Sequence, residues 1–176
     1  MAGGLVVITE LQQLPSSPNT ERLVLGSIQL DDARLADVAG VLEIEDFSLE
    51  KHRRIYGRML DMYSCGVRID RVTLTEELDR QGQLESVDGM SYLVSLDDGL
   101  PEIVNLDSYV RIIKEKSHLR QTIFACQRII DQSFMEKPSE EVLDTGRAIL
   151  DRVEAKTRSS HDWVLPYDVV RQHGSS

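Results

Sequence analysis

Four histidines and two cysteines are the residues of this sequence best suited to bind a metal or to attack a substrate. The histidines are His52, His118, His161 and His173. They are too scattered to suggest a zinc site or a two-histidine iron site, so we predict that each is a surface or partly packed residue. The two cysteines, Cys65 and Cys126, lack a metal-binding or redox spacing. We expect both to be buried free thiols.

Charged residues form two kinds of cluster that could imitate a functional site. Asp97-Asp98 and Glu140-Glu141 are pairs of adjacent residues, whose side chains do not face each other on a helix. The position of the first pair at a turn and of the second at the start of a helix is sufficient to explain their charge. The densest positive stretch contains Arg111, Lys114, Lys116, His118 and Arg120. On a helix these side chains spread around much of the circumference. This favours solvated helix surface or polar contacts between subunits over direct DNA binding.

No loop of the type that binds a nucleotide occurs in the sequence. A nucleotide-hydrolysing motor needs a G-x-x-x-x-G-K-[ST] loop whose amides and lysine hold the phosphates, and the sequence has none. There is also no glycine-rich turn between a strand and a helix that could bind a dinucleotide. We therefore predict no catalytic residue, no cofactor and no metal in this chain.

The composition indicates a globular protein with an acidic surface. Asp and Glu number 30 against 20 Lys and Arg, which gives a formal charge of −10. Phosphate binding depends on a cationic face, so the acidity favours solubility or a basic protein partner over DNA. No apolar run approaches the ~18–20 residues that span a bilayer, and the N-terminus lacks the basic flank and cleavage site of a signal peptide. We expect a cytoplasmic protein without membrane contact.

The apolar pattern predicts an all-α protein in which a compact helical head is followed by a long antiparallel helical hairpin. Short helices are expected to begin near Thr20, Asp31, Ser48, Thr73 and Met90. Thr73 is followed three residues later by Glu76, which is the spacing of a capping box. No segment shows the two-residue alternation of a strand.

A longer apolar stripe begins at Asn105 and continues to Phe134 at steps of three and four residues. Pro138 ends this helix and Ser139 begins a second one, so the two should form a hairpin. In a hairpin, each helix buries only the apolar stripe that faces the other helix. The remaining apolar residues must pack against the head or against another chain. The predicted self-association or partner interface is Ile113, Arg120, Ile123, Ile130, Phe134, Leu143, Ile149, Leu150 and Val153.

Four segments follow from this pattern. We predict a flexible tail over residues 1–19, the head over 20–104 and the hairpin over 105–156. Residues 157–176 are expected to be a linker, or the start of a linker helix that is cut short.

Short segments between residues 19 and 156 occur together in an order and at a spacing that resembles a known family. The segments are Thr20–Ile28, Asp46-Phe47 with His52–Tyr56, Asp70–Leu74, Leu84 and Gly89 with Tyr92-Leu93, Asn105 with Tyr109, Ile112 and Lys116–Arg120, and Val142–Asp144. They resemble the N-terminal domain of DnaB-type replicative DNA helicases. One departure is Asp88-Gly89, where the family usually has two glycines.

The resemblance implies a role in assembly and docking. Domains of this family pair through their hairpins into a collar above a hexameric motor, and primase, or in some systems a loader, docks there. The expected partners are a second copy of the chain and primase, with a helicase loader or full-length helicase as further candidates and DNA contacted only indirectly. ATP and Mg²⁺ would belong to a motor domain that this chain lacks, so no ATP- or DNA-contacting residue can be carried over.

Other classes of protein share parts of this sequence pattern. The helicase-binding domain of bacterial primases resembles the same fold, although Lys116–Arg120 and Asp70–Thr73 favour the helicase side. A helicase remnant, or an inactive competitor of full-length helicase, would have the same sequence features. An enzyme acting alone would need a concave site whose titratable groups have shifted pKa values, and the sequence suggests no such site.

Overall fold

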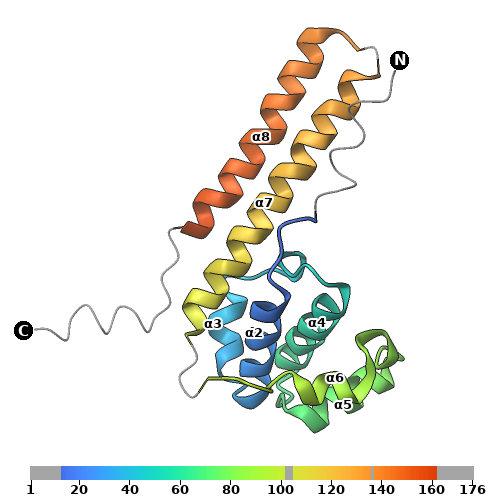
Figure 1. Ribbon diagram of the computed structural model, residues 1–176, viewed down its shortest axis with the longest axis vertical. Coiled ribbons are helices and arrows are strands. Elements are labelled where there is room, and N and C mark those ends of the chain that lie inside the picture. Colours follow the sequence, from blue (N-terminus) through green and yellow to red (C-terminus); the bar gives the residue numbers. More distant parts are fainter. Residues whose placement is uncertain (1–12, 102–104, 136, 162–176) are drawn as a thin grey trace, which may run out of the picture.

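The computed structural model describes residues 13–101, 105–135 and 137–161 (Figure 1). The elements, in chain order, are α2 (Pro18–Leu30), α3 (Arg34–Ala39), η1 (Ile44–Asp46), α4 (Glu50–Ser64), α5 (Arg71–Arg80), η2 (Glu85–Val87), α6 (Gly89–Ser95), α7 (Leu106–Ser133) and α8 (Ser139–His161). The structure confirms the predicted all-α fold, since the described residues form helices and connections without a strand. It also confirms the head and the long hairpin (Figure 1).

The core of the head is built mainly from aliphatic side chains of α2 to α6. Its largest fully buried members include Leu25, Phe47 and Tyr56. Tyr56 keeps its hydroxyl satisfied by donating to the Leu42 carbonyl oxygen at 3.0 Å. Val110 and Ile113 of α7 belong to the same core. The first part of α7 therefore completes the head, and the rest of α7 projects from it beside α8 (Figure 1).

Helices α2 and α6 approach so closely that only glycine fits at their contact. A Cβ on Gly26 would lie 2.2 Å from the carbonyl oxygen of Leu96. Arg22, one turn earlier on α2, donates from Nη1 to the carbonyl oxygens of Ser95 at 2.8 Å and Asp98 at 2.8 Å. These carbonyls lie in the last residue of α6 and just after it, where helical partners are missing. The arginine thus joins the two helices and caps one of them.

Two helix starts differ from the prediction. Helix α2 begins at Pro18 rather than after Thr20, because proline is well suited to the first turn, where its missing N–H is not needed. Helix α5 begins at Arg71, since the Asp70 carboxylate accepts hydrogen bonds from the backbone N–H of Val72 and Thr73 at 2.9 and 3.0 Å. The capping box therefore joins Asp70 to Thr73 and not Thr73 to Glu76.

The hairpin begins where it was predicted and extends further at its C-terminal end. The Asn105 side chain accepts from the Ser108 backbone N–H at 3.2 Å and caps α7, and α8 begins at Ser139. Gly146 is buried against α7, and a Cβ there would be 3.5 Å from Ile129. Helix α8 continues to His161, because residues 157–161 extend its hydrogen-bonded ladder instead of starting a linker. The remainder of the predicted linker, residues 162–176, lies outside the described residues.

The predicted N-terminal tail, residues 1–19, also lies partly within and partly outside the described residues. Residues 1–12 lie outside the described residues, whereas Pro18 and Asn19 already belong to α2. Pro15 is held in place, because its carbonyl oxygen accepts a hydrogen bond of 2.9 Å from Arg120 on α7. None of the described helices is both long and apolar enough to cross a membrane.

Candidate functional site

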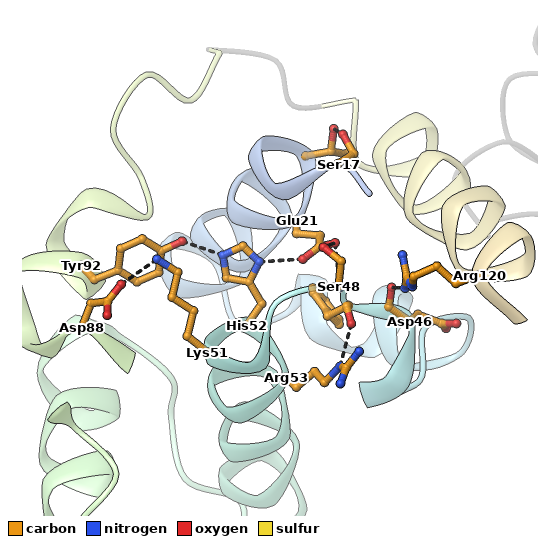
Figure 2. Close-up of polar contacts among 12 residues, drawn as sticks. Ser17, Glu21, Asp46, Ser48, Lys51, His52, Arg53, Asp88, Tyr92 and Arg120 are labelled. Carbon is orange, nitrogen blue, oxygen red and sulfur yellow. Dashed lines mark hydrogen bonds and ion pairs between the residues drawn. The ribbon is translucent and has the colours of Figure 1, made fainter. Parts of the chain in front are cut away.

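The head contains a buried polar relay formed by Glu21, His52 and Tyr92 (Figure 2). His52 Nδ1 lies 2.7 Å from Glu21 Oε2, and His52 Nε2 is hydrogen-bonded to the Tyr92 hydroxyl. The other carboxylate oxygen of Glu21 accepts from the backbone N–H and the hydroxyl of Ser48 at 2.9 and 2.6 Å. An ionised carboxylate can only accept, so Nδ1 of His52 donates. In the neutral imidazole, Nε2 then accepts from Tyr92.

The relay exists because polar residues occupy core positions of two amphipathic helices. Glu21 is spaced three, four and seven residues before the buried Val24, Leu25 and Ile28. His52 precedes Ile55, Tyr56 and Met59 by the same steps. Both side chains must therefore point into the core, where each needs a hydrogen-bonding partner.

Lys51 covers the outer end of the relay. Its ammonium lies 3.5 Å from the centre of the Tyr92 ring and 2.7 Å from the Asp88 carboxylate (Figure 2). Burial lowers the pKa of Lys51, but the Asp88 carboxylate and the Tyr92 ring outweigh it, so this pKa lies above its ordinary value. Burial raises the pKa of Tyr92, and the nearby Lys51 reverses only part of that rise. The Tyr92 hydroxyl therefore keeps its proton and remains available as a donor to His52.

Glu21 is held in its charged form. Burial raises the pKa of its carboxyl, but the hydrogen bonds from His52 and Ser48 together outweigh burial. The pKa of Glu21 consequently lies below its ordinary value. The relay combines a charged acceptor, a histidine and a hydroxyl, which is the order of groups that moves a proton in hydrolases.

The surroundings of the relay give it a structural use instead. His52 is fully buried, and its two ring nitrogens are both engaged within the protein. An open cavity of about 360 Å³ lies elsewhere on the head, lined by Asp32, Tyr63, Val67 and neighbouring residues and by no member of the relay. Within the described residues, no group of three or more His, Cys, Asp or Glu side chains could hold a metal. The relay ties α2, α4 and α6 together.

A second buried polar cluster joins the head to α7. Asp46 is fully buried, and its Oδ2 accepts from Lys114 Nζ at 2.6 Å and from the Glu43 backbone N–H at 2.8 Å. Arg120 Nη2 donates to the Asp46 carbonyl oxygen at 2.6 Å. Lys114 and Arg120 of the predicted basic cluster therefore make contacts within the chain, and not on the solvated helix surface or between subunits as predicted.

The predicted interface residues have three different environments. Ile113 and Arg120 are buried in the head, so they cannot line an exposed interface as predicted, and the reason is that this part of α7 completes the core. Ile123, Ile149 and Val153 are half-buried along the hairpin. The exposed members are Ile130, Phe134, Leu143 and Leu150.

Predictions about the burial of four single residues were wrong. His52 and His118 are buried rather than at the surface or partly packed, with 0% and 7% of their area exposed, because each lies on a core-facing side of its helix. Cys65 and Cys126 are free thiols, but both are exposed rather than buried. Cys65 follows the last residue of α4, and Cys126 lies on the projecting part of α7. The periodicity around His52 could have revealed its burial from the sequence.

The fold defines an all-α domain whose compact head, crosslinked by buried polar residues, supports a projecting helical hairpin. The chain belongs to the DnaB-like helicase N terminal domain family, whose profile matches residues 13–115. This confirms the predicted family.

Two replicative helicases are similar in sequence to this chain. The chain is 35% identical over 144 residues to the replicative DNA helicase DnaB of Geobacillus stearothermophilus, covering 81% of this chain and 32% of that protein. It is 32% identical over 165 residues to the replicative DNA helicase DnaC of Bacillus subtilis (strain 168), covering 90% and 36%. The chain thus spans about a third of the length of these relatives.

Solved structures show the same fold. The N-terminal domain of DnaB helicase from Mycobacterium tuberculosis is 33% identical with a TM-score of 0.73, covering 80% of this chain and 99% of that one. A DnaB-like replicative helicase, described with its interactions with primase, is 25% identical with a TM-score of 0.65, covering 88% and 35%. The N-terminal domain of DnaB from Helicobacter pylori, also described with its interactions with primase, is 26% identical with a TM-score of 0.58, covering 73% and 98%.

Proposed function

We propose that this chain is a non-catalytic domain through which a replicative helicase associates with itself and docks primase. The observation that carries the proposal is a line of exposed apolar side chains on the hairpin. The family supplies the context of DNA replication. Helicase activity, and the ATP hydrolysis that drives it, would reside in a part of the protein that lies beyond this chain.

The apolar line on α7 has the spacing of a helix that packs against another helix. Ile112 and Leu119 are seven residues apart and each is 41% exposed, and Cys126 follows after another seven. Ile123 and Ile130 form a second row, each four residues after a member of the first row, and Ile130 is 39% exposed. Two rows with steps of three and four residues form the seam along which helices pair in coiled coils. We name the five residues the α7 seam.

Helix α8 and the tip of the hairpin add to this surface. Leu143 and Leu150 are seven residues apart on α8, and they are 59% and 43% exposed. Phe134 and Met135 at the tip are 73% and 66% exposed. Exposed apolar residues that recur along an element, rather than singly, are typical of a protein interface. A second copy of the chain is the occupant that the helix-pairing spacing favours.

Primase is proposed as the second partner. Two solved relatives are described together with their interactions with primase. The matched regions cover 88% and 73% of this chain, so both the head and much of the hairpin have counterparts there. A loader and full-length helicase remain further candidates for the same domain. Family membership favours the helicase over the primase side of this interaction.

Light scattering on a size-exclusion column tests both parts of the proposal. The purified chain should form a dimer or larger ring as its concentration rises, and the primase C-terminal domain of the same organism should shift the elution further. A chain that stays monomeric at high concentration and ignores primase would refute the role while leaving the family unchanged. ATP turnover by the purified chain would contradict its non-catalytic character.

A further inference from the structure

The short segment that leads into α2, residues 13–17, is fastened to α7. The Arg120 guanidinium donates to the Pro15 carbonyl oxygen at 2.9 Å and to the Asp46 carbonyl oxygen at 2.6 Å. Arg120 is only 5% exposed, so both hydrogen bonds are largely shielded from water. Figure 1 shows this segment, in dark blue, leaving the head next to α7. The chain that precedes Pro15 therefore starts from a fixed point on α7.

Beyond Arg120, the same side of α7 carries an apolar side chain and then a basic one. Phe124 follows Arg120 by four residues and Arg128 follows Phe124 by four, so the three lie along one side of the helix. Phe124 is 56% exposed, and it lies on a different side of α7 from the α7 seam. Arg128 is also exposed, and no described residue forms an ion pair with it. An aromatic ring and an unpaired cation are thus left open beside the point where Pro15 is held.

The sequence before Pro15 contains groups that match this surface. Residues 5–8 are Leu, Val, Val and Ile, and Leu11 follows them. Glu10 is the only charged side chain that precedes α2. Apolar side chains are stabilised when they leave water and pack against a ring, and a carboxylate is attracted by a guanidinium. The composition of this stretch therefore complements the surface formed by Phe124 and Arg128.

The lengths match as well. Phe124 lies about 6 Å along α7 from Arg120, which holds Pro15. Leu11 is four residues before Pro15, and four residues span about 6 Å in a helix and up to ~14 Å when extended. Leu11 can therefore reach Phe124 in either conformation. Pro15 also keeps the preceding residues close to α7, which gives them a high effective concentration at this surface.

We propose that residues 5–11 dock on α7 of the same chain, with Leu11 against the Phe124 ring and Glu10 on the side of Arg128. We name this segment the N-terminal strap. The docked strap withdraws Phe124 from water and leaves the α7 seam, on another side of the helix, open. The inference concerns one chain, so it does not depend on self-association or on primase.

Fluorine NMR of the chain labelled with para-fluorophenylalanine tests the strap. The resonance of a ring in contact with water shifts when heavy water replaces water, whereas that of a buried ring does not. Phe47 is 0% exposed and marks the buried limit, and the chain unfolded in urea marks the exposed limit. The Phe124 resonance should shift as little as that of Phe47. A shift midway between the limits, which an exposure of 56% predicts for an uncovered ring, would overturn the proposal.

Two variants show whether the strap is what covers the ring. Leu11→Asp removes the apolar contact and should raise the solvent shift of Phe124 to the midway value. Gln13→Asp is the matched control, because it adds the same charge to the same part of the chain at an exposed position, and it should keep the shift small. The Phe47 shift should stay small in both variants, which shows that the head remains folded. A Phe124 shift that stays small in Leu11→Asp would overturn the proposal.

A mixing experiment tests whether the strap binds its own chain. Fluorine-labelled Leu11→Asp is mixed with an excess of unlabelled natural chain, whose strap can reach the labelled Phe124 only from another copy. The Phe124 shift should keep the midway value in the mixture. A fall of the shift to the buried limit would place the strap on a second copy and overturn its assignment to the same chain.

Discussion

The imidazole of His52 and the carboxylate of Glu21 form a hydrogen bond of 2.7 Å between Nδ1 and Oε2, and their side chains are 0% and 1% exposed. The two residues are 31 positions apart in the sequence, on different helices. Such a pair is stable in the interior because Ser48 and Tyr92 occupy the remaining hydrogen-bonding positions. It fixes the relative placement of α2 and α4 in the head.

Removing the Glu21 carboxylate should strongly destabilise the head. Glu21→Ala leaves the Nδ1–H of His52 and the backbone N–H and hydroxyl of Ser48 without their acceptor in a buried site. Each unsatisfied buried donor costs about 1–3 kcal/mol. Glu50→Ala is a matched control, because Glu50 is 63% exposed and pairs with Arg54 one turn along the same helix. That change should cost under ~1 kcal/mol. Urea unfolding of both variants measures the difference, and equal losses would contradict the structural role of the relay.

The pH dependence of stability should reveal the charge on Glu21. Its pKa is lowered on folding, so the group binds a proton more weakly in the folded than in the unfolded chain. Its contribution is complete above the unfolded value of ~4.3 and is lost as the pH falls through the lower folded value. Glu21→Gln removes this contribution. The variant should lose less stability than the natural chain between about pH 5 and pH 3 in urea unfolding, whereas parallel losses would show that Glu21 is not the responsible group.

The close contact between α2 and α6 leads to a prediction for Gly26. An alanine Cβ at position 26 would lie 2.2 Å from a backbone oxygen of Leu96, which cannot move without shifting α6. Gly26→Ala should therefore destabilise the chain by about 3 kcal/mol or more. Gly146→Ala is the control, since its Cβ would meet only Ile129 side-chain atoms at 3.5 Å or more. That variant should change thermal stability little, and similar losses in both variants would contradict the close approach of α2 and α6.

The backbone at Asp88 gives a further test of stability. Asp88 has φ 66°, a left-handed conformation that glycine adopts more easily than a residue with a Cβ. Its carboxylate compensates in part by binding Lys51. Asp88→Ala keeps the strain and loses the ion pair, whereas Asp88→Gly loses the ion pair and the strain together. The glycine variant should be the more stable of the two by ~1 kcal/mol in urea unfolding, and the reverse order would show that this conformation is not strained.

Local signals allowed much of the fold to be predicted from the sequence. The starts of α7, next to Asn105, and of α8, at Ser139, lie where the sequence predicted them, because capping residues and Pro138 act on their immediate neighbours. The cap of α5 was placed three residues too late, since Asp70 and Thr73 are both good capping residues and only the geometry selects between them. Errors of this kind move a boundary and leave the element in place.

The polar interior could be predicted only in part. The spacing of Glu21 relative to Val24, Leu25 and Ile28 places it in the core, and the same reasoning applies to His52. Nothing in the local sequence, however, shows that these two residues are partners, because their contact depends on how α2 packs against α4. The contacts of Asp46 with Lys114 and Arg120 have the same origin, since they join segments 68 and 74 residues apart.

The α7 seam predicts how self-association can be abolished while the fold is kept. Ile130 is 39% exposed in the single chain, so Ile130→Asp should leave the head intact, whereas an unpaired charge buried between two copies would cost several kcal/mol of association free energy. Phe124→Asp is the control, because Phe124 is 56% exposed but lies about a third of a turn around α7 from the seam. Sedimentation velocity should show a monomer for Ile130→Asp and the natural association for Phe124→Asp, with unchanged helical circular dichroism in both. Association that survives Ile130→Asp and fails with Phe124→Asp would move the interface to the other side of α7. Loss of helical signal in Ile130→Asp would instead place Ile130 in the core of the domain.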